Sequence, residues 1–215
     1  MATNLMGTNM SVSVENAVGS SKAISSITLA NPGVVTCTAS HGLSTGAVVR
    51  LTMTAGMPEL DGQVVRIASA TGTDFTLEGL DTSAYTAFTS GSAAAISSWS
   101  TLTGAQNITM PNPSPAKADA TTLVDTVKQY EYGLPDAPDG TITGIYRPGD
   151  TAVAKIAANT KSRTATAFKV AWSGGQYHYF NANVSGGQGF DLAQNQIATA
   201  TINFTPVKDV MYYAS

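Results

Sequence analysis

The chain has 215 residues and a formal net charge of −3 at pH 7, which allows one large β domain or two small ones. Its acid excess leaves no basic face to neutralise phosphates and so argues against sequence-reading or tight DNA binding. Charged residues make up only 12% of the sequence, against roughly 25% in ordinary soluble domains, which suits a surface buried between copies of the chain but also a generic secreted β-protein.

The N-terminal segment contains the first predicted strand. Met10–Val18 alternates small polar with apolar residues, as a strand does. The first 16 residues lack a basic n-region and an apolar h-region, and no run approaches the roughly 20 apolar residues of a transmembrane helix. We therefore expect a soluble, unexported chain without membrane insertion. Cys37 is the only cysteine, so assembly in a reducing cytoplasm is expected.

Short β-type runs follow one another at close spacing between residues 23 and 97. The runs VVTCTAS, AVVRLTMTA, QVVRIASA and DFTLEG are separated by glycine-containing turns, which predicts a small barrel or sandwich. Two arginines stand there against five carboxylates, so this segment carries the whole net charge of −3. The charged residues are Arg50, Arg66, Glu59, Asp61, Asp74, Glu78 and Asp81.

The sequence pattern changes after Trp99. Met110–Asp119 contains three prolines and predicts an extended linker or arm. The apolar/polar run from Leu123 to Tyr132 and the run TITGIY predict two strands around an acidic Pro/Gly loop at 134–140. Asp150 is the predicted N-cap of the helix TAVAKIAANTKS.

The C-terminal part predicts a hairpin and a last strand. Thr164–Trp172 has a clean period of two, and Ser173-Gly174-Gly175 turns the chain into QYHYFNANV. ATATINFTPV then alternates an apolar face with a polar one. The predicted fold class is mainly β: a sandwich or barrel with one short flanking α-helix, plus a small β-barrel module.

No motif predicts catalysis or a cofactor. Cys37 and His41 are four residues apart, which is about 13 Å along a strand, whereas a nucleophile and its base need about 3 Å. We therefore predict a core cysteine and a turn histidine. His178 is expected to pack or to line a surface. Asp136 and Asp139 have the chemistry to bind a cation, but a solvated turn is the preferred interpretation.

Aromatic residues are frequent in the second half of the chain. They favour a core and a seam between subunits, because several alternate in register within predicted strands. A sugar-binding platform is the alternative. The residues concerned are Tyr130, Tyr132, Tyr146, Trp172, Tyr177, Tyr179 and Phe180.

The second half of the sequence resembles the tail-tube family of long-tailed bacteriophages. The resemblance rests on TTLVDTVKQYEYGLPDAPDGTITG, the helix after Asp150 and GFDLAQNQIATATINFTPV. It implies a virion protein, assembled in the host cytoplasm, whose rings of six subunits stack into a hollow tube for DNA. It also implies tape-measure and tail-terminator type phage proteins as partners, and transient passage of double-stranded DNA without specific binding.

The middle segment resembles a small β module named for the first catalytic-cysteine half-domain of ubiquitin-activating enzymes. The likeness covers Ala39–Ser92 and rests on HGL at 41–43, MP at 57–58, DG at 61–62 and Phe75. It implies a fold and no ubiquitin chemistry. We expect residues 1–22 and 98–215 to form a discontinuous tail-tube domain and residues 23–97 to form an inserted module on the outer surface of the tube.

The resemblance also predicts assembly surfaces. Strands 11–18, 164–172, 177–184 and 198–205 are the expected wall, and Lys169 must either face away from the lumen or be neutralised there. The candidate lumen-lining residues are Glu15, Asp125, Asp191, Thr199, Thr201 and Asn203. The candidate inter-ring contacts are Met110, Pro111, Pro113, Pro115, Leu134, Pro135, Asp136, Pro138 and Asp139.

A different class of function is the alternative. The small barrel suits a receptor- or carbohydrate-binding module of a tail tip or fibre, and a more distant alternative is an accessory domain of a secreted enzyme. Hollow tubes or hexameric rings in electron micrographs favour the first interpretation, and a stable glycan-binding monomer favours the second.

Overall fold

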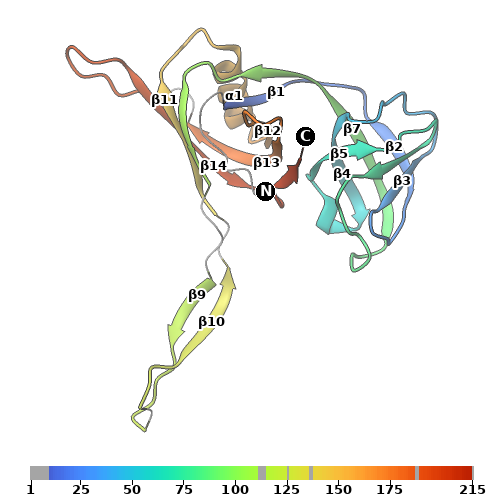
Figure 1. Ribbon diagram of the computed structural model, residues 1–215, viewed down its shortest axis with the longest axis horizontal. Helices are drawn as coiled ribbons and strands as arrows, with labels where there is room; N and C mark the ends of the chain where they lie inside the picture. Colours follow the sequence, from blue (N-terminus) through green and yellow to red (C-terminus); the bar gives the residue numbers. More distant parts are fainter. Residues whose placement is uncertain (1–9, 111–114, 125, 136–137, 187–188, 215) are drawn as a thin grey trace.

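A computed structural model describes residues 10–110, 115–124, 126–135, 138–186 and 189–214 of the chain (Figure 1). Antiparallel strands dominate the described part, together with one α-helix and one short 3-10 helix. The mainly β prediction is therefore confirmed. The strands are β1 Ser11–Val18, β2 Lys22–Ile27, β3 Val34–Cys37, β4 Val48–Gly56, β5 Val64–Ala68, β6 Asp74–Leu77, β7 Phe88–Thr101, β8 Ala105–Thr109, β9 Pro115–Asp119, β10 Tyr130–Pro135, β11 Gly140–Ile145, β12 Thr166–Ala171, β13 Tyr177–Gly186, β14 Thr199–Pro206 and β15 Met211–Tyr213, and the helices are η1 Pro58–Leu60 and α1 Thr151–Ser162.

Six strands close into a small barrel. Their order is β2-β3-β6-β5-β4-β7, and a further pairing of β2 with β7 joins the two ends. Alternate side chains point inward and form a core that includes the fully buried Val35, Leu51, Ile67 and Phe75. Closure removes the exposed edges that such short strands would otherwise present.

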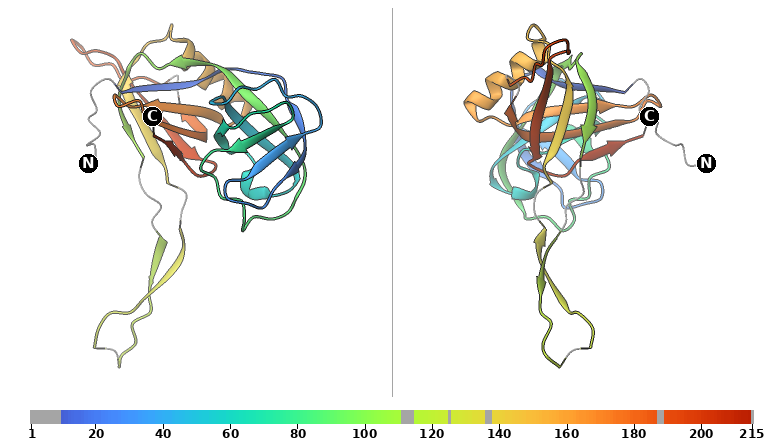
Figure 2. Two further views of the ribbon diagram at one scale, coloured as in Figure 1. Left: turned by 45° about the vertical axis from the view of Figure 1, so that its right-hand side comes forward. Right: turned by 90° about the vertical axis from the view of Figure 1, so that its left-hand side faces the viewer.

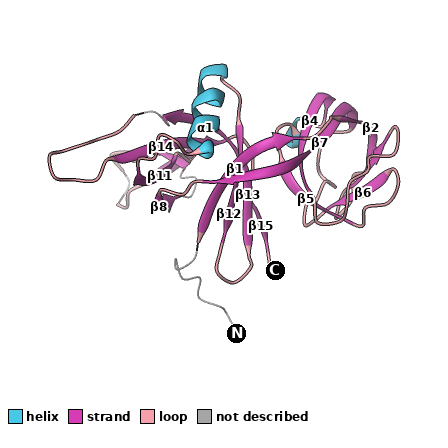
Figure 3. Ribbon diagram, turned by 90° about the horizontal axis from the view of Figure 1, so that it is seen from above, coloured by secondary structure: helices cyan, strands magenta, loops and turns pink. Residues whose placement is uncertain are grey.

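The long strand β7 belongs to both halves of the molecule. Its first part, 88–95, pairs with β4 and β2, and its second part, 96–101, pairs with β1. From β1 the sheet continues as β12-β13-β14-β11-β8. Figure 3 shows the barrel at one end of the molecule and this second sheet at the other.

The helix α1 covers one face of the second sheet. The Asp150 carboxylate accepts a hydrogen bond from Ala152 N at 2.8 Å, and the helix ends at Arg163 in the left-handed conformation with φ of 54°. Ile156 is buried against the sheet in a core with Phe168 and Phe180. The helix predicted after Asp150 is confirmed over the same residues.

The opposite face of the second sheet contacts the barrel. The carboxylate of Glu15 on β1 accepts hydrogen bonds from Arg50 Nη1 on β4 at 2.8 and 3.0 Å. Glu15 is only 2% exposed, so its charge depends on this one arginine. Beside the pair, the ring of Tyr179 lies 5.8 Å from that of Trp99 on β7.

The C-terminal strand fastens the barrel from the other side. β15 pairs with the beginning of β13, and the hydroxyl of Tyr213 accepts a hydrogen bond from Arg66 N at 2.9 Å. The Arg66 guanidinium lies 4.6 Å from the centre of the same ring. Gln63 Nε2 donates to Asp209 O at 3.1 Å, and Lys208 Nζ donates to Pro58 O at 2.9 Å. The barrel is thus held at two separate places.

A long hairpin projects from the second sheet. Strand β9 pairs with β10 in a separate two-stranded sheet, which we call the arm (residues 115–135) (Figures 1 and 2). The two strands that flank loop 134–140 do not pair with each other: β10 pairs with β9, whereas β11 belongs to the second sheet. Both edges of β11 are occupied by β14 and β8, so β10 has no edge to join there. Of the run from Leu123 to Tyr132 that was expected to form a strand, only 130–132 belong to β10, and residues 123–124 and 126–129 lie in the turn region of the arm.

Removing Arg50 should destabilise the fold. Arg50→Met leaves the buried Glu15 carboxylate without its partner and should lower the free energy of unfolding by about 3 kcal/mol. Urea unfolding of the monomer measures the change.

A double variant and a second ion pair serve as controls. Glu15→Gln with Arg50→Met should recover most of the loss, because no buried charge remains. Arg66→Met breaks a pair whose Glu78 side chain is one third exposed, so it should cost only about 1 kcal/mol. A loss below that value for Arg50→Met would contradict the proposed importance of this pair.

Candidate assembly surfaces

The most exposed large apolar side chains gather on two projections. Among the described side chains, every large apolar one that is 59% or more exposed lies on the arm or on residues 189–198, which we call the β13–β14 loop. Exposed apolar groups that gather in this way are typical of surfaces that contact another molecule. The residues are Leu123, Val124, Val127 and Tyr132 on the arm and Phe190, Leu192 and Ile197 on the loop.

The tip of the arm is closed by its own hydrogen bonds. Ala120 N donates to Gln129 O at 3.0 Å, and Gln129 N donates to Thr121 Oγ1 at 3.0 Å. The Thr121 hydroxyl donates to the Asp119 carboxylate at 2.5 Å and lowers the pKa of Asp119. These bonds join the two strands just below the tip, and Leu123, Val124 and Val127 beyond them are exposed.

The sequence-derived inter-ring candidates lie at the base of the arm. Met110 is half-buried and packs against the core that α1 forms with the second sheet. Pro115 faces Pro135 across the hairpin, and Leu134 is also in β10. Pro138 is half-buried, and Asp139 accepts a hydrogen bond from the Thr205 hydroxyl. Pro111, Pro113 and Asp136 lie outside the described residues.

Sequence reasoning missed the residues at the two projecting ends. Leu123, Val124 and Val127 were assigned to a strand, although their spacing gives no regular period of two. The β13–β14 loop was treated as a connection, although it holds three large apolar residues. For this loop, the signal in the sequence was the presence of large apolar residues inside a Gly/Gln/Asn-rich segment.

The β13–β14 loop is also ordered by local contacts. The ring of Phe190 stacks on that of Tyr146, with centroids 5.0 Å apart and an angle of 21° between the planes. Asp191 and Thr199 exchange two backbone hydrogen bonds of 2.8 and 2.9 Å. Leu192 and Ile197 remain exposed beyond this anchor.

An uncharged polar face extends over β14, β11 and β8. Thr199, Thr201 and Asn203 are all exposed on one face of β14. Asn203 faces Thr141 and then Thr109 across the strands, and Thr201 faces Thr143 and then Asn107. No charged residue occurs in these three strands. We call this surface the hydroxyl face; it includes Asn107, Thr109, Thr141, Thr143, Thr199, Thr201 and Asn203.

Of the two charged lumen candidates among the described residues, Asp191 pairs with Thr199 at the border of the hydroxyl face, and Glu15 lies elsewhere. Glu15 is buried against Arg50 and is therefore unavailable to an open wall. Asp191 lies on the exposed β13–β14 loop, and Asp125 is outside the described residues. Lys169 Nζ lies 5.3 Å from the centre of the Trp99 ring, so this side chain turns toward β7. Burial lowers the pKa of Lys169.

Cys37 and His41, the two residues considered for catalysis, are both buried. Cys37 is buried, and burial raises the pKa of its thiol. His41 is buried too, with Nδ1 accepting from Leu43 N at 2.9 Å and Nε2 lying 3.2 Å from Asp74 O. No group of three or more His, Cys, Asp or Glu residues with metal-binding geometry occurs in the part of the chain that the structure describes.

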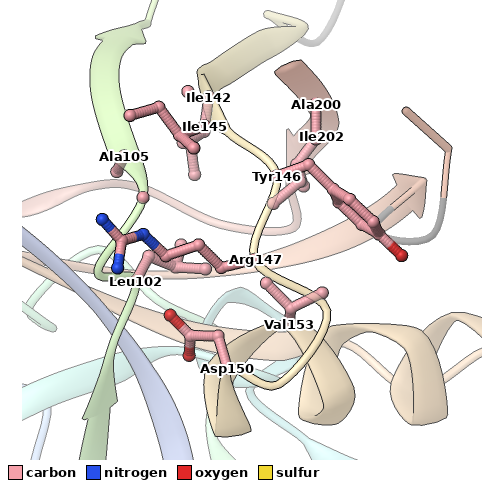
Figure 4. A pocket seen from close by; sticks show the side chains of 12 residues that line it. Leu102, Ala105, Ile142, Ile145, Tyr146, Arg147, Asp150, Val153, Ala200 and Ile202 are labelled. Atoms are coloured by element: carbon pink, nitrogen blue, oxygen red, sulfur yellow. The ribbon is translucent and has the colours of Figure 1, made fainter. Parts of the chain in front are cut away.

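A small pocket with a partly apolar lining lies beside the start of α1. Its volume is about 30 Å³, enough for water, and Leu102, Ile142 and Val153 line its apolar part (Figure 4). The Asp150 carboxylate at its rim already binds Ala152 N and the Thr103 hydroxyl, both at 2.8 Å. Within the described residues, no helix has the length and apolar character needed to cross a membrane.

Comparison with known proteins identifies one family. Residues 55–215 match the family described as phage tail tube protein, TTP. The match covers three quarters of the chain and begins within the barrel, in strand β4. No curated protein matches the sequence.

Acid should weaken the sheet at His178. Trp172 Nε1 donates to His178 Nδ1 at 2.8 Å, and burial lowers the pKa of His178 below its ordinary value of about 6.5. The unfolded chain therefore takes up this proton at a higher pH than the folded chain. The corresponding stability is present above about pH 6.5 and is lost as pH falls through the folded pKa.

The variant His178→Gln isolates this effect, because an amide oxygen still accepts from Trp172 but does not titrate. The fall in melting temperature from about pH 7.5 to about pH 5 should be smaller in the variant than in the parent chain. Equal falls in both proteins would refute the assignment.

Proposed function

The chain belongs to the phage tail tube protein family, and on this basis we propose that it forms rings, six subunits each, that stack into the hollow tail tube of a long-tailed phage. The protein is a structural component of the virion tail. Strands of neighbouring copies continue the sheet around each ring, so that the wall has no free edges. β8 stands at the end of the strand order, and its outer edge has no neighbour among the described strands.

The arm is the observation that carries this proposal. It extends far from the rest of the molecule (Figures 1 and 2), and the side chains of Leu123, Val124 and Val127 near its end are exposed. A contact of this kind joins different surfaces of two copies, and it repeats without end if it does not close. We assign it to the junction between rings, with Pro115, Pro135 and Pro138 stiffening its base.

The hydroxyl face is the proposed lining of the channel. DNA carries one negative charge per roughly 1.7 Å of its axis, and screening at physiological salt acts over about 8 Å. Charges on the wall would therefore bind or repel passing DNA, whereas threonine and asparagine do neither strongly. The absence of charge from β8, β11 and β14 supports this role.

The barrel is the proposed decoration of the outer tube surface. We propose that residues 1–22 and 98–215 form the tail-tube domain. Residues 23–97 form the inserted module, which resembles the half-domain of ubiquitin-activating enzymes. The Glu15–Arg50 pair and the contacts of β15 support a fixed orientation of the barrel. Tape-measure and tail-terminator type proteins are the proposed partners, and the host cytoplasm is the proposed place of assembly.

Charging the arm tip should prevent stacking. Leu123→Asp with Val124→Asp should abolish tubes in electron micrographs, because two carboxylates resist burial at the junction. The free energy of unfolding should change by no more than about 0.5 kcal/mol, since both side chains are exposed.

The matched control is Leu29→Asp on the barrel, a half-exposed leucine away from the arm. It should leave the tubes intact. Normal tubes from the Leu123→Asp, Val124→Asp variant would contradict a role of the arm in stacking.

A cation in the channel should slow DNA. Thr201→Lys places one positive charge per subunit on the hydroxyl face and should retain tube assembly while slowing DNA ejection at least about tenfold. Thr201→Gln, of similar size but neutral, should eject at the parental rate. Equal ejection rates for both variants would exclude this face as the lining.

A further inference from the structure

The two apolar projections lie at different ends of the molecule. The arm points away from the second sheet in one direction, and the β13–β14 loop leaves the sheet in another, as the separate views show (Figures 1 and 2). They cannot meet within one chain. Two copies arranged head to tail, however, would bring the arm of one toward the loop of the next.

The exposed groups on the two projections are of matching kinds. The arm tip offers the aliphatic side chains of Leu123, Val124 and Val127. The loop offers Leu192 and Ile197 beside the ring of Phe190. Joining these surfaces would cover six of the most exposed apolar side chains of the described residues in one step.

Charged residues stand beside these groups on both projections: Asp125 and Lys128 in the sequence of the arm tip, and Asp191 in the loop. Lys128 follows Val127 on the arm, and Asp191 stands between Phe190 and Leu192 on the loop. Both residues are exposed. An arm from a second copy can place its Lys128 ammonium next to the Asp191 carboxylate.

Local contacts within a single copy hold both projections. Hydrogen bonds among Ala120, Thr121 and Gln129 close the arm tip. The stacking of Phe190 on Tyr146 and the backbone pairing of Asp191 with Thr199 hold the loop. Both projections are thus anchored next to the side chains that would dock.

We propose that the tip of the arm, Leu123, Val124 and Val127, docks on the β13–β14 loop, Phe190, Leu192 and Ile197, of a copy in the next ring. The proposal rests on the proposed function, since it names the acceptor of the arm in the stacked tube. Each contact is small and is repeated by every subunit of a ring. Stacking is then multivalent, so single copies stay apart while rings bind firmly.

Engineered cysteines test the contact. A chain with Val124→Cys and Leu192→Cys should form disulfides between copies when tubes are mildly oxidised. Because every copy donates one cysteine and accepts another, non-reducing gels should show a ladder that continues past the number of subunits in a ring. The native Cys37 is buried and should not interfere.

Matched variants separate this contact from others. Val124→Cys with Leu29→Cys on the barrel should give no ladder. Lys128→Glu or Asp191→Lys alone should slow tube growth about tenfold at low salt, and the two together should restore it to within about threefold. This rescue requires that the two residues face each other.

The outcomes distinguish the two proposals. Tubes in electron micrographs without a 124–192 ladder would overturn the acceptor site and leave the tube function standing. A ladder that stops at the size of one ring would place the contact between neighbours within a ring and overturn the proposal as well. If the unmodified chain forms no tubes or rings, the proposed function fails and the acceptor site with it.

Discussion

The orientation of the barrel on the second sheet depends on one continuous strand. β7 completes the barrel with its first part and extends the second sheet with its second part, so backbone hydrogen bonds join the two halves. The buried Glu15–Arg50 pair and Tyr213 on β15 then fix the barrel against the sheet. A side chain can rotate about its own bonds, but a strand shared by two sheets cannot turn without breaking one of them.

This attachment divides the second sheet into surfaces with separate uses. One face is covered by α1, and part of the other is covered by the barrel. The hydroxyl face of β14, β11 and β8 remains open, together with the outer edge of β8 and the two apolar projections. These are the surfaces that a subunit of a tube needs: a lining, a lateral edge and two axial contacts.

The sequence predicted the elements whose pattern is local. The period of two in β12 and β14 and the Asp150 cap of α1 were sufficient for these elements. It did not predict that Glu15 is buried, because its partner Arg50 is 35 residues away. The apolar run at Leu123 was taken as a strand, since the sequence does not say which edges of β11 are already occupied. Each of these errors arose because the outcome depends on contacts between residues that are far apart in the sequence.

The central claim is that the chain builds a tube whose lining is the hydroxyl face. A reconstruction of assembled tubes by electron cryomicroscopy tests it most directly, because it shows which side of every strand faces the channel. The account predicts Thr201 and Asn203 of β14 on the channel wall, the barrel on the outside and the arm crossing between rings. A channel lined by the barrel, with the hydroxyl face buried or turned outward, would contradict it.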